Sequence, residues 1–222
     1  MSDVKSQVAI IDLGMGNLFS VKHACEYVGL RASITSSRQE IFNADAVILP
    51  GVGAFGDAME TLRRLDLVSV LKEIAASPKL LVGICLGMQL LMTESFEFGR
   101  HSGLGIIPGT VVRFENPVGP HGALKVPQVC WNRMYRIEGL DDSWADSLLY
   151  GLANGVFMYF VHSFYVEPED RSVNIATTQY GDVEFCSALR YRNIFACQSH
   201  PERSGPHGLR VYHNLASMLK SS

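Results

Sequence analysis

The chain has 222 residues, of which 47% are hydrophobic and 18% are charged, as in a globular protein with a substantial core. Its formal net charge of −3 gives no reason to expect nucleic acid or an anionic membrane as a partner. No apolar run is long enough to span a membrane, and the first residues, MSDVKSQVAIIDLG, lack the pattern of a signal peptide. We therefore expect a cytoplasmic protein.

The first half of the chain alternates short apolar runs with helical patterns. Buried strands are predicted for three of these runs, residues 8–13, 46–50 and 79–84. Helices are predicted to follow them, one between Asn17 and Gly29, one over 57–76 and one over 86–94. This alternation is typical of βαβ units, which build a parallel sheet covered by helices on both faces.

The second half is mostly strand-like and closes with a helix. Strands are predicted over residues 109–114, 129–137, 156–166, 173–180, 184–191 and 194–199. The closing helix, 207–220, carries its inward residues Leu209, Tyr212, Leu215, Met218 and Leu219 on one side. We expect one α/β domain over residues 1–222, with an open, mainly parallel sheet, flanking helices and an antiparallel extension. The longest irregular segment, 115–125, is a candidate functional loop.

One of the five cysteines stands out by its setting. None is spaced as a CxxC pair, and the odd number argues against a disulfide framework and a structural zinc site. Cys85 lies in VGICLG at a strand-to-helix junction, between Gly83 and Gly87, which is the G-x-C-x-G form of a nucleophile elbow. The helix start favours the reactive thiolate, and the Leu86 N–H would face a developing oxyanion. The alternative is a buried cysteine at an ordinary turn.

A base is predicted in the segment IFACQSHPERSG. Pro201 ends the strand directly after His200, so the imidazole should lie at a strand end, where parallel sheets build their sites. Glu202 can accept a hydrogen bond from this imidazole and complete a triad. The other reading is a strand-end histidine beside a solvated glutamate. The remaining histidines outside the strands are expected to be solvated: His23, His101, His121, His207 and His213.

A glycine-rich turn follows the second predicted strand, in LPGVGAFGDAM. It contains Gly51, Val52 and Gly53 but matches neither a P-loop nor a dinucleotide-binding fingerprint. A turn of this kind can aim a backbone N–H at a substrate oxygen. We therefore expect it to supply the second donor of an oxyanion hole.

Four motifs together, PGVGAFGDAM, GICLGMQLL, FVHSFY and QSHPERSG, resemble the class I, triad-type glutamine amidotransferases. More narrowly, the chain resembles the glutaminase subunits of imidazole glycerol phosphate synthases, nearly from end to end. The resemblance implies that Cys85 attacks the side-chain amide of L-glutamine to form a thioester. It implies that His200 protonates the departing ammonia and later activates water, with Glu202 as its partner. The oxyanion would be held by Leu86 and by Val52 or Gly53.

The resemblance also implies how substrate and partner are bound. The glutamine-binding residues would be Gly51, Gln89, Glu97, His162, Ser163 and Phe164, the last three through their backbone. A strand such as MYFVHSFY would also be largely core in any protein of this size. The ammonia would pass to a synthase or cyclase subunit in a heterodimer. Neither a cofactor nor a metal is implied, because thiol chemistry with such a triad needs none.

The sequence departs from the family pattern at PQVCWN. The histidine-pathway subunits usually read Pro-His-x-Gly-Trp-Asn there, whereas this chain has Gln128 and Cys130. That segment lies toward the partner in the family, so the departure leaves the partner open. One alternative is a subunit that serves a synthase installing amidine groups on surface sugars. Others are a stand-alone cysteine hydrolase and a catalytically idle interaction subunit.

Overall fold

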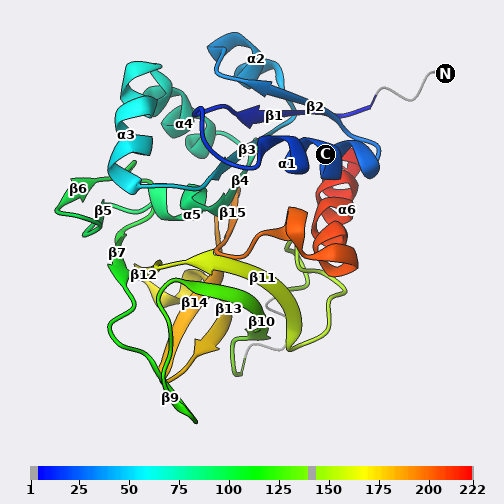
Figure 1. The fold of residues 1–222 in the computed structure, drawn as a ribbon. Coiled ribbons are helices and arrows are strands. Elements are labelled where there is room, and N and C mark those ends of the chain that lie inside the picture. The colour runs from blue at the N-terminus through cyan, green and yellow to red at the C-terminus, as the bar shows by residue number, and fades with distance from the viewer. Residues whose placement is uncertain (1–4, 140–143, 222) are drawn as a thin grey trace.

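A mixed sheet runs through the computed structural model, which describes residues 5–139 and 144–221 (Figure 1). Its parallel part has the spatial order β2-β1-β3-β4-β15. These strands are β1 (Gln7–Ile11), β2 (Arg31–Thr35), β3 (Ala46–Gly51), β4 (Leu80–Cys85) and β15 (Ile194–Cys197). The three strands predicted in the first half are confirmed. β2, an edge strand in which only Thr35 is buried, was not predicted, because it lacks an apolar run.

Helices cover both faces of the parallel part, as predicted. On one face lie α1 (Leu18–Tyr27) and α6 (Gly205–Ser221). On the other lie α2 (Arg38–Asn43), α3 (Phe55–Arg64) and α4 (Leu67–Ala76). Side chains of β1 alternate between the two cores, since Val8 and Ile10 pack with α1 and α6. Ala9 and Ile11 pack with α3 and α4.

Two helix predictions were wrong in their extent. The helix expected over 57–76 is split into α3 and α4, because Asp66 adopts a left-handed backbone with φ 54° between them. The helix expected over 86–94 ends early: α5 spans Leu86–Leu90, and a short strand β5 (Glu94–Ser95) follows. β5 and its neighbour β6 (His101–Ser102) form the far edge of the sheet.

The second half forms the predicted antiparallel extension. Its strands are β7 (Gly109–Arg113), β10 (Gln128–Arg136), β11 (Val156–His162), β12 (Phe164–Pro168), β13 (Asn174–Tyr180) and β14 (Val183–Tyr191). The strand expected over 156–166 is interrupted at Ser163, where the chain bends from β11 into β12. The segment 115–125 is not wholly irregular, because β8 (Val118–Gly119) pairs with β9 (Gly122–Ala123). Two 3₁₀ turns, η1 (Arg171–Val173) and η2 (Pro201–Arg203), complete the described elements.

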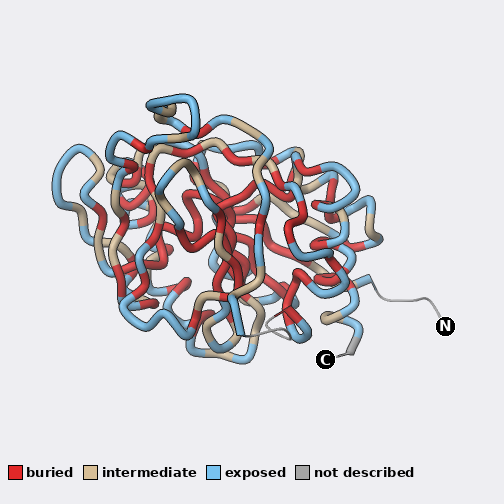
Figure 2. The backbone as a smooth tube through the Cα atoms, turned by 90° about the horizontal axis from the view of Figure 1, so that it is seen from below, coloured by how far each residue is buried: buried red, intermediate tan, exposed pale blue. Residues whose placement is uncertain are grey.

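The carboxyl ends of the central parallel strands meet at one place. Gly51 of β3 lies opposite Cys85 of β4, and Ile84 lies opposite Cys197 of β15. Figure 2 shows that buried backbone gathers along the middle of the molecule, while the exposed segments lie around it. The ends of β3, β4 and β15 therefore converge where the parallel part meets the antiparallel extension (Figure 1).

Candidate active site

Cys85 sits on a strained turn at the end of β4. Its φ of 53° and ψ of −109° lie in a region that side-chain-bearing residues rarely adopt. The flanking glycines make the turn possible. A Cβ atom at Gly87 would lie 1.7 Å from the carbonyl oxygen of Leu49, and one at Gly83 would lie 3.1 Å from the Ala196 Cβ. The sequence thus holds α5 tightly against β3, with the thiol at the junction of strand and helix.

The glycine-rich turn after β3 lies beside the same junction. Gly51 pairs with Cys85, and a Cβ atom at Gly51 would lie 3.2 Å from the Cβ of Leu86. Gly53 has a φ of +115°, which favours glycine at this position. Val52 is partly exposed, whereas Leu86 is buried. The structure therefore brings the three predicted oxyanion residues into the neighbourhood of the thiol.

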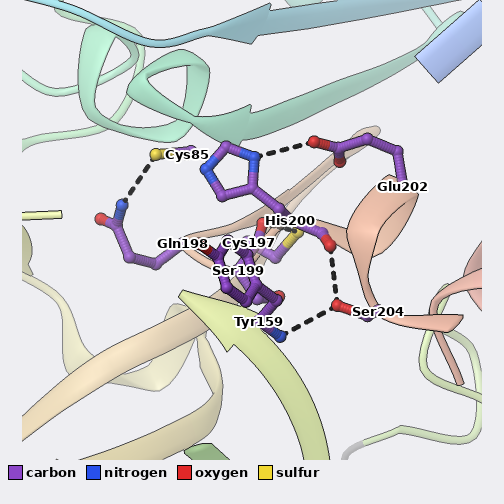
Figure 3. A network of polar contacts seen from close by, with 8 residues as sticks. All are labelled: Cys85, Tyr159, Cys197, Gln198, Ser199, His200, Glu202 and Ser204. Carbon is purple, nitrogen blue, oxygen red and sulfur yellow. Dashed lines mark hydrogen bonds and ion pairs between the residues drawn. The ribbon is translucent and has the colours of Figure 1, made fainter. Parts of the chain in front are cut away.

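His200 lies just beyond β15, with its imidazole between Cys85 and Glu202 (Figure 3). Its Nδ1 is 2.8 Å from Glu202 Oε1, and both side chains are almost fully buried. The backbone fixes the ring as well, since the His200 N–H donates to the carbonyl of Tyr159 and its own carbonyl accepts from Ser204 Oγ. Ser204 Oγ in turn accepts from the Tyr159 N–H. Hydrogen bonds therefore hold both the ring and the backbone of His200, as a positioned base requires.

The electrostatic setting of His200 favours its charged form. Burial by itself would lower the pKa of this imidazole, but the Cys85 sulfur and the Glu202 carboxylate outweigh burial and raise the pKa to about 10. An imidazolium beside a cysteine stabilises the thiolate, which is the nucleophilic form. The other five histidines expected to be solvated are exposed or half-buried: His23, His101, His121, His207 and His213.

A pair of glutamines extends the network on the far side of Cys85. Gln198 Nε2 donates to Cys85 Sγ at 3.4 Å, and Gln198 Oε1 accepts from Gln89 Nε2 at 3.1 Å. Gln89 Nε2 also lies 3.0 Å from the carbonyl oxygen of Phe164. Gln198 was not predicted as a site residue from the sequence. Its position two residues before His200 was the available signal, because alternate residues of an extended chain share a face.

A cavity of about 930 Å³ opens near this network. Three of the predicted substrate residues line it, namely Glu97, Ser163 and Phe164. Glu97 Oε2 accepts a hydrogen bond from the Phe55 N–H at 2.5 Å, and burial raises the pKa of this carboxyl above its usual value. The cavity is walled by both halves of the molecule, since Glu97 follows β5 and Phe164 begins β12.

The His162 side chain lies away from this cavity, inside the antiparallel extension. Its ring packs among aromatic side chains, 5.2 Å from Phe114 and 5.2 Å from Phe185 between centroids. Nδ1 lies 2.9 Å from the Phe164 carbonyl oxygen, and burial lowers the pKa of the imidazole to about 3. The imidazole is thus a neutral core group, and only the backbone of this position remains a candidate for binding substrate.

Three other cysteines are buried in apolar surroundings. Burial raises the pKa of Cys25 to about 12 and raises the pKa values of Cys186 and Cys197 further. These thiols are therefore inert at neutral pH. Within residues 5–139 and 144–221, no cluster of three or more His, Cys, Asp or Glu side chains could hold a metal ion. No helix of these same residues is long and apolar enough to cross a membrane.

The sequence profile of the family described as glutamine amidotransferase class-I matches residues 9–217. The chain belongs to this family. Among the amidotransferase's curated relatives, two proteins called imidazole glycerol phosphate synthase subunit HisH are each 45% identical to it. The one from Rhodopirellula baltica aligns with 95% of this chain and 97% of its own length, and the one from Syntrophotalea carbinolica with 95% and 100%.

Solved structures show the fold of this class-I amidotransferase in other proteins. The structure of PurLQS from Thermotoga maritima matches 97% of this chain and 100% of its own, with a TM-score of 0.72 and 18% identity. A crystal structure described as a glutamine amidotransferase matches 97% and 99%, with a TM-score of 0.70 and 19% identity. The expected α/β architecture, a parallel sheet with flanking helices and an antiparallel extension, is confirmed.

Proposed function

We propose that residues 1–222 form one amidotransferase domain, the glutaminase subunit of an imidazole glycerol phosphate synthase. The chain hydrolyses L-glutamine to glutamate and ammonia and delivers the ammonia to a cyclase subunit in a heterodimer. The observation that carries this proposal is the clustering of Cys85, His200 and Glu202 at and just beyond the carboxyl ends of the central strands β4 and β15. Relatives 45% identical over nearly the whole chain carry the subunit's name and support the pathway.

The first chemical step is the attack of Cys85 on the glutamine side-chain amide. The thiolate sulfur bonds to the amide carbon, and the carbonyl oxygen takes up the negative charge. Backbone N–H groups of Leu86 and of Val52 or Gly53 stabilise this oxyanion, a role that favours fixed donors in a water-poor site. The strained φ of Cys85 supports this role, because nucleophile elbows hold the sulfur clear of their own helix.

His200 moves the protons of both half-reactions. As an imidazolium it protonates the amide nitrogen, so the C–N bond breaks and ammonia leaves a Cys85 thioester. As a neutral imidazole it then takes a proton from water, which attacks the thioester and releases glutamate. Glu202 holds the ring through Nδ1, leaving Nε2 for the reacting atoms. The pKa of His200, raised to about 10, supports its starting as the acid.

The cavity beside Glu97 takes the amino-acid end of glutamine. The Glu97 carboxylate pairs with the α-ammonium group of the substrate, while the backbone of Ser163 and Phe164 contacts the rest of its amino-acid end. Gln89 holds the Phe164 carbonyl in place, and Gly51 allows the close contact with Leu86 beside Cys85. An anionic residue at this position favours free glutamine over a peptide-bound one, since only the free amino acid carries the ammonium group.

The partner binds the outer face of β10 and β11. This partner face comprises the exposed side chains Val129, Trp131, Tyr135 and Phe157. Contiguous exposed apolar side chains of this kind mark protein–protein contacts. Trp131 contacts the ring of Tyr159, with centroids 6.1 Å apart, and the backbone of Tyr159 bonds His200. A partner bound to this face would thus contact β11, the strand whose backbone holds His200 in place.

The unusual residues Gln128 and Cys130 lie on the inner side of β10. Gln128 is fully buried, with Nε2 3.6 Å from Cys130 Sγ, and Cys130 is half-buried. Along the same strand the exposed positions are Val129, Trp131, Arg133 and Tyr135. The departure from the family pattern therefore changes residues that lie behind the partner face and not its exposed side chains. It does not favour an amidinating synthase as the partner.

The test is ammonia release from glutamine by the purified chain, alone and reconstituted with a cyclase from the histidine pathway. We expect weak hydrolysis alone and stimulation of roughly 5-fold to 150-fold when partner and acceptor are present, the usual range of coupling between sites. A stand-alone hydrolase would turn over equally fast in both states. An idle interaction subunit would bind the cyclase without releasing ammonia in either.

A further inference from the structure

Two buried oxygen atoms, one in the triad and one beside it, have no hydrogen-bond partner among the described residues. One is Oε2 of Glu202, whose other carboxylate oxygen binds His200. The second is the hydroxyl of Tyr212, one of the largest fully buried side chains of the protein. Buried polar atoms are nearly always satisfied, so each such atom needs an explanation. One oxygen is an obligate acceptor and the other can donate, so each can meet the other's need.

The packing of α6 against η2 brings the Tyr212 side chain close to Glu202. A Cβ atom at Gly208 would lie 1.8 Å from the carbonyl oxygen of Pro201, so this face of α6 rests directly on η2. Glu202 belongs to η2. Tyr212 is four residues after Gly208 and therefore on the same face of the helix. Helical side chains lean toward the N-terminus of their helix, which carries the Tyr212 ring back over the turn that holds Glu202.

The charges around Tyr212 leave the carboxylate as its anionic neighbour. The ionisable groups that face the phenol are Glu202 from η2, Cys25 from α1 and Cys197 from β15. Burial keeps both thiols protonated at neutral pH. Burial, reinforced by the charge of Glu202, raises the pKa of Tyr212 well above 10, so the phenol keeps its proton. Tyr212 is thus a fixed hydrogen-bond donor.

We propose that Tyr212 is a positioning residue for the triad: its hydroxyl donates, through one buried water, to Oε2 of Glu202. Such a water would have Tyr212 Oη and Glu202 Oε2 as its two polar partners, the minimum that a buried water needs. With Oε2 held, Oε1 stays aligned on His200 Nδ1, and the imidazole stays aligned toward Cys85. Tyr212 touches neither substrate nor the reacting atoms. The inference rests on the proposed role of Cys85, His200 and Glu202.

The first test replaces Tyr212 by Phe, which removes the hydroxyl and keeps the ring. The readout is the pH dependence of Cys85 alkylation by iodoacetamide, followed on the full chain by mass spectrometry of the Cys85 peptide. Loss of the hydroxyl should loosen Glu202, weaken its support of the imidazolium and raise the apparent pKa of alkylation. At a pH below that pKa the alkylation rate should fall roughly threefold to tenfold, the size expected for one neutral hydrogen bond.

Two control experiments distinguish a positioning role of the Tyr212 hydroxyl from a role in packing alone. Ser33→Ala removes another unpartnered buried hydroxyl, on β2 far along the sheet, and should leave the alkylation profile unchanged. Tyr212→Phe should lose its effect in a Glu202→Gln background, because the two groups act as a unit. An unchanged profile in Tyr212→Phe, a shift to lower pH, or an equal loss in both backgrounds would overturn the proposal.

A direct observation covers the case in which Tyr212→Phe does not fold. A high-resolution crystal structure of the unaltered chain should show ordered water within hydrogen-bond distance of Tyr212 Oη and Glu202 Oε2. Clear density with no water bridging these atoms would refute the arrangement. The proposed function fails separately: it falls if the unaltered chain with its partner releases no ammonia from glutamine, whereas this inference falls if that chain is active and Tyr212→Phe matches it.

Discussion

The parallel part of the sheet and the antiparallel extension each bury a histidine, and they do so with opposite effect. At the end of β15, His200 lies between Cys85 and Glu202, and its pKa rises to about 10. Inside the extension, His162 lies among aromatic rings with one carbonyl partner, and its pKa falls to about 3. Burial disfavours charge in both. The anionic neighbours at the strand end decide the difference, so charge partners rather than burial mark the chemical site.

The largest expected effect separates the cysteines of the two regions. Cys85→Ala should reduce glutamine hydrolysis by about a thousandfold or more, because no other described thiol is placed to attack. Cys186→Ala, in the extension, is the matched control, since its thiol is buried and its pKa is raised by burial. It should keep turnover and lose only stability. Ammonia release and circular dichroism measure both variants, and retained turnover in Cys85→Ala would remove Cys85 as the nucleophile.

The second expectation compares the two histidines by activity. His200→Gln should cost roughly a thousandfold in kcat, the scale of losing a triad base. His162→Gln should keep kcat within about tenfold and destabilise the fold by about 1–3 kcal/mol, the cost of disturbing a buried hydrogen bond. Steady-state kinetics and denaturant unfolding provide the measurements. Comparable losses of kcat in both variants would mean that the extension also takes part in catalysis.

The third expectation compares the histidines by pH. The folded-state pKa of His200 lies above the ordinary 6.5, so its stabilising contribution is complete below that value and lost as pH rises through about 10. The folded-state pKa of His162 lies below 6.5, so its contribution is present above that value and lost as pH falls toward about 3. Unfolding free energies across pH, compared with those of the His→Gln variants, should show opposite slopes. Parallel slopes would contradict the contrast.

The smallest expected effect concerns Gln128 and Cys130 in the extension. The double change Gln128→His with Cys130→Gly should lower the melting temperature by about 2–4 °C, as about 1 kcal/mol does in a chain of this size. The reasons are repacking around a fully buried side chain and a glycine inside a strand. Partner-stimulated ammonia release should change little. An unchanged melting temperature with altered stimulation would assign these residues to partner coupling instead.

The parallel half was largely predictable from sequence because its strands are apolar on both faces. β3 and β4 were found nearly to the residue, and the glycines around Cys85 indicated the elbow before any geometry. The edge strand β2 was missed because an exposed edge needs no apolar run. The break at Asp66 was missed because nothing in the local pattern signals a left-handed aspartate.

Candidate site residues could be predicted where a sequence motif indicates their chemistry. They could not be predicted where tertiary packing determines their position. The motifs around Cys85 and His200 drew attention to the triad, and the resemblance drew it to Gln89 and Glu97. The bend at Ser163, which separates the backbone facing the cavity from the His162 ring in the aromatic core, depends on the pairing of β11 and β12 with different neighbours. Tyr212 was expected on the inner face of the last helix, but its approach to Glu202 follows from the close contact at Gly208.

The most direct test of the account is to trap the covalent intermediate. The chain, with its cyclase partner and acceptor, is mixed with glutamine, quenched in acid during turnover and digested for mass spectrometry. The account predicts a glutamyl thioester on Cys85 and none on the buried thiols of Cys25, Cys186 and Cys197. A thioester on another cysteine, or steady ammonia release with no adduct on Cys85, would contradict it.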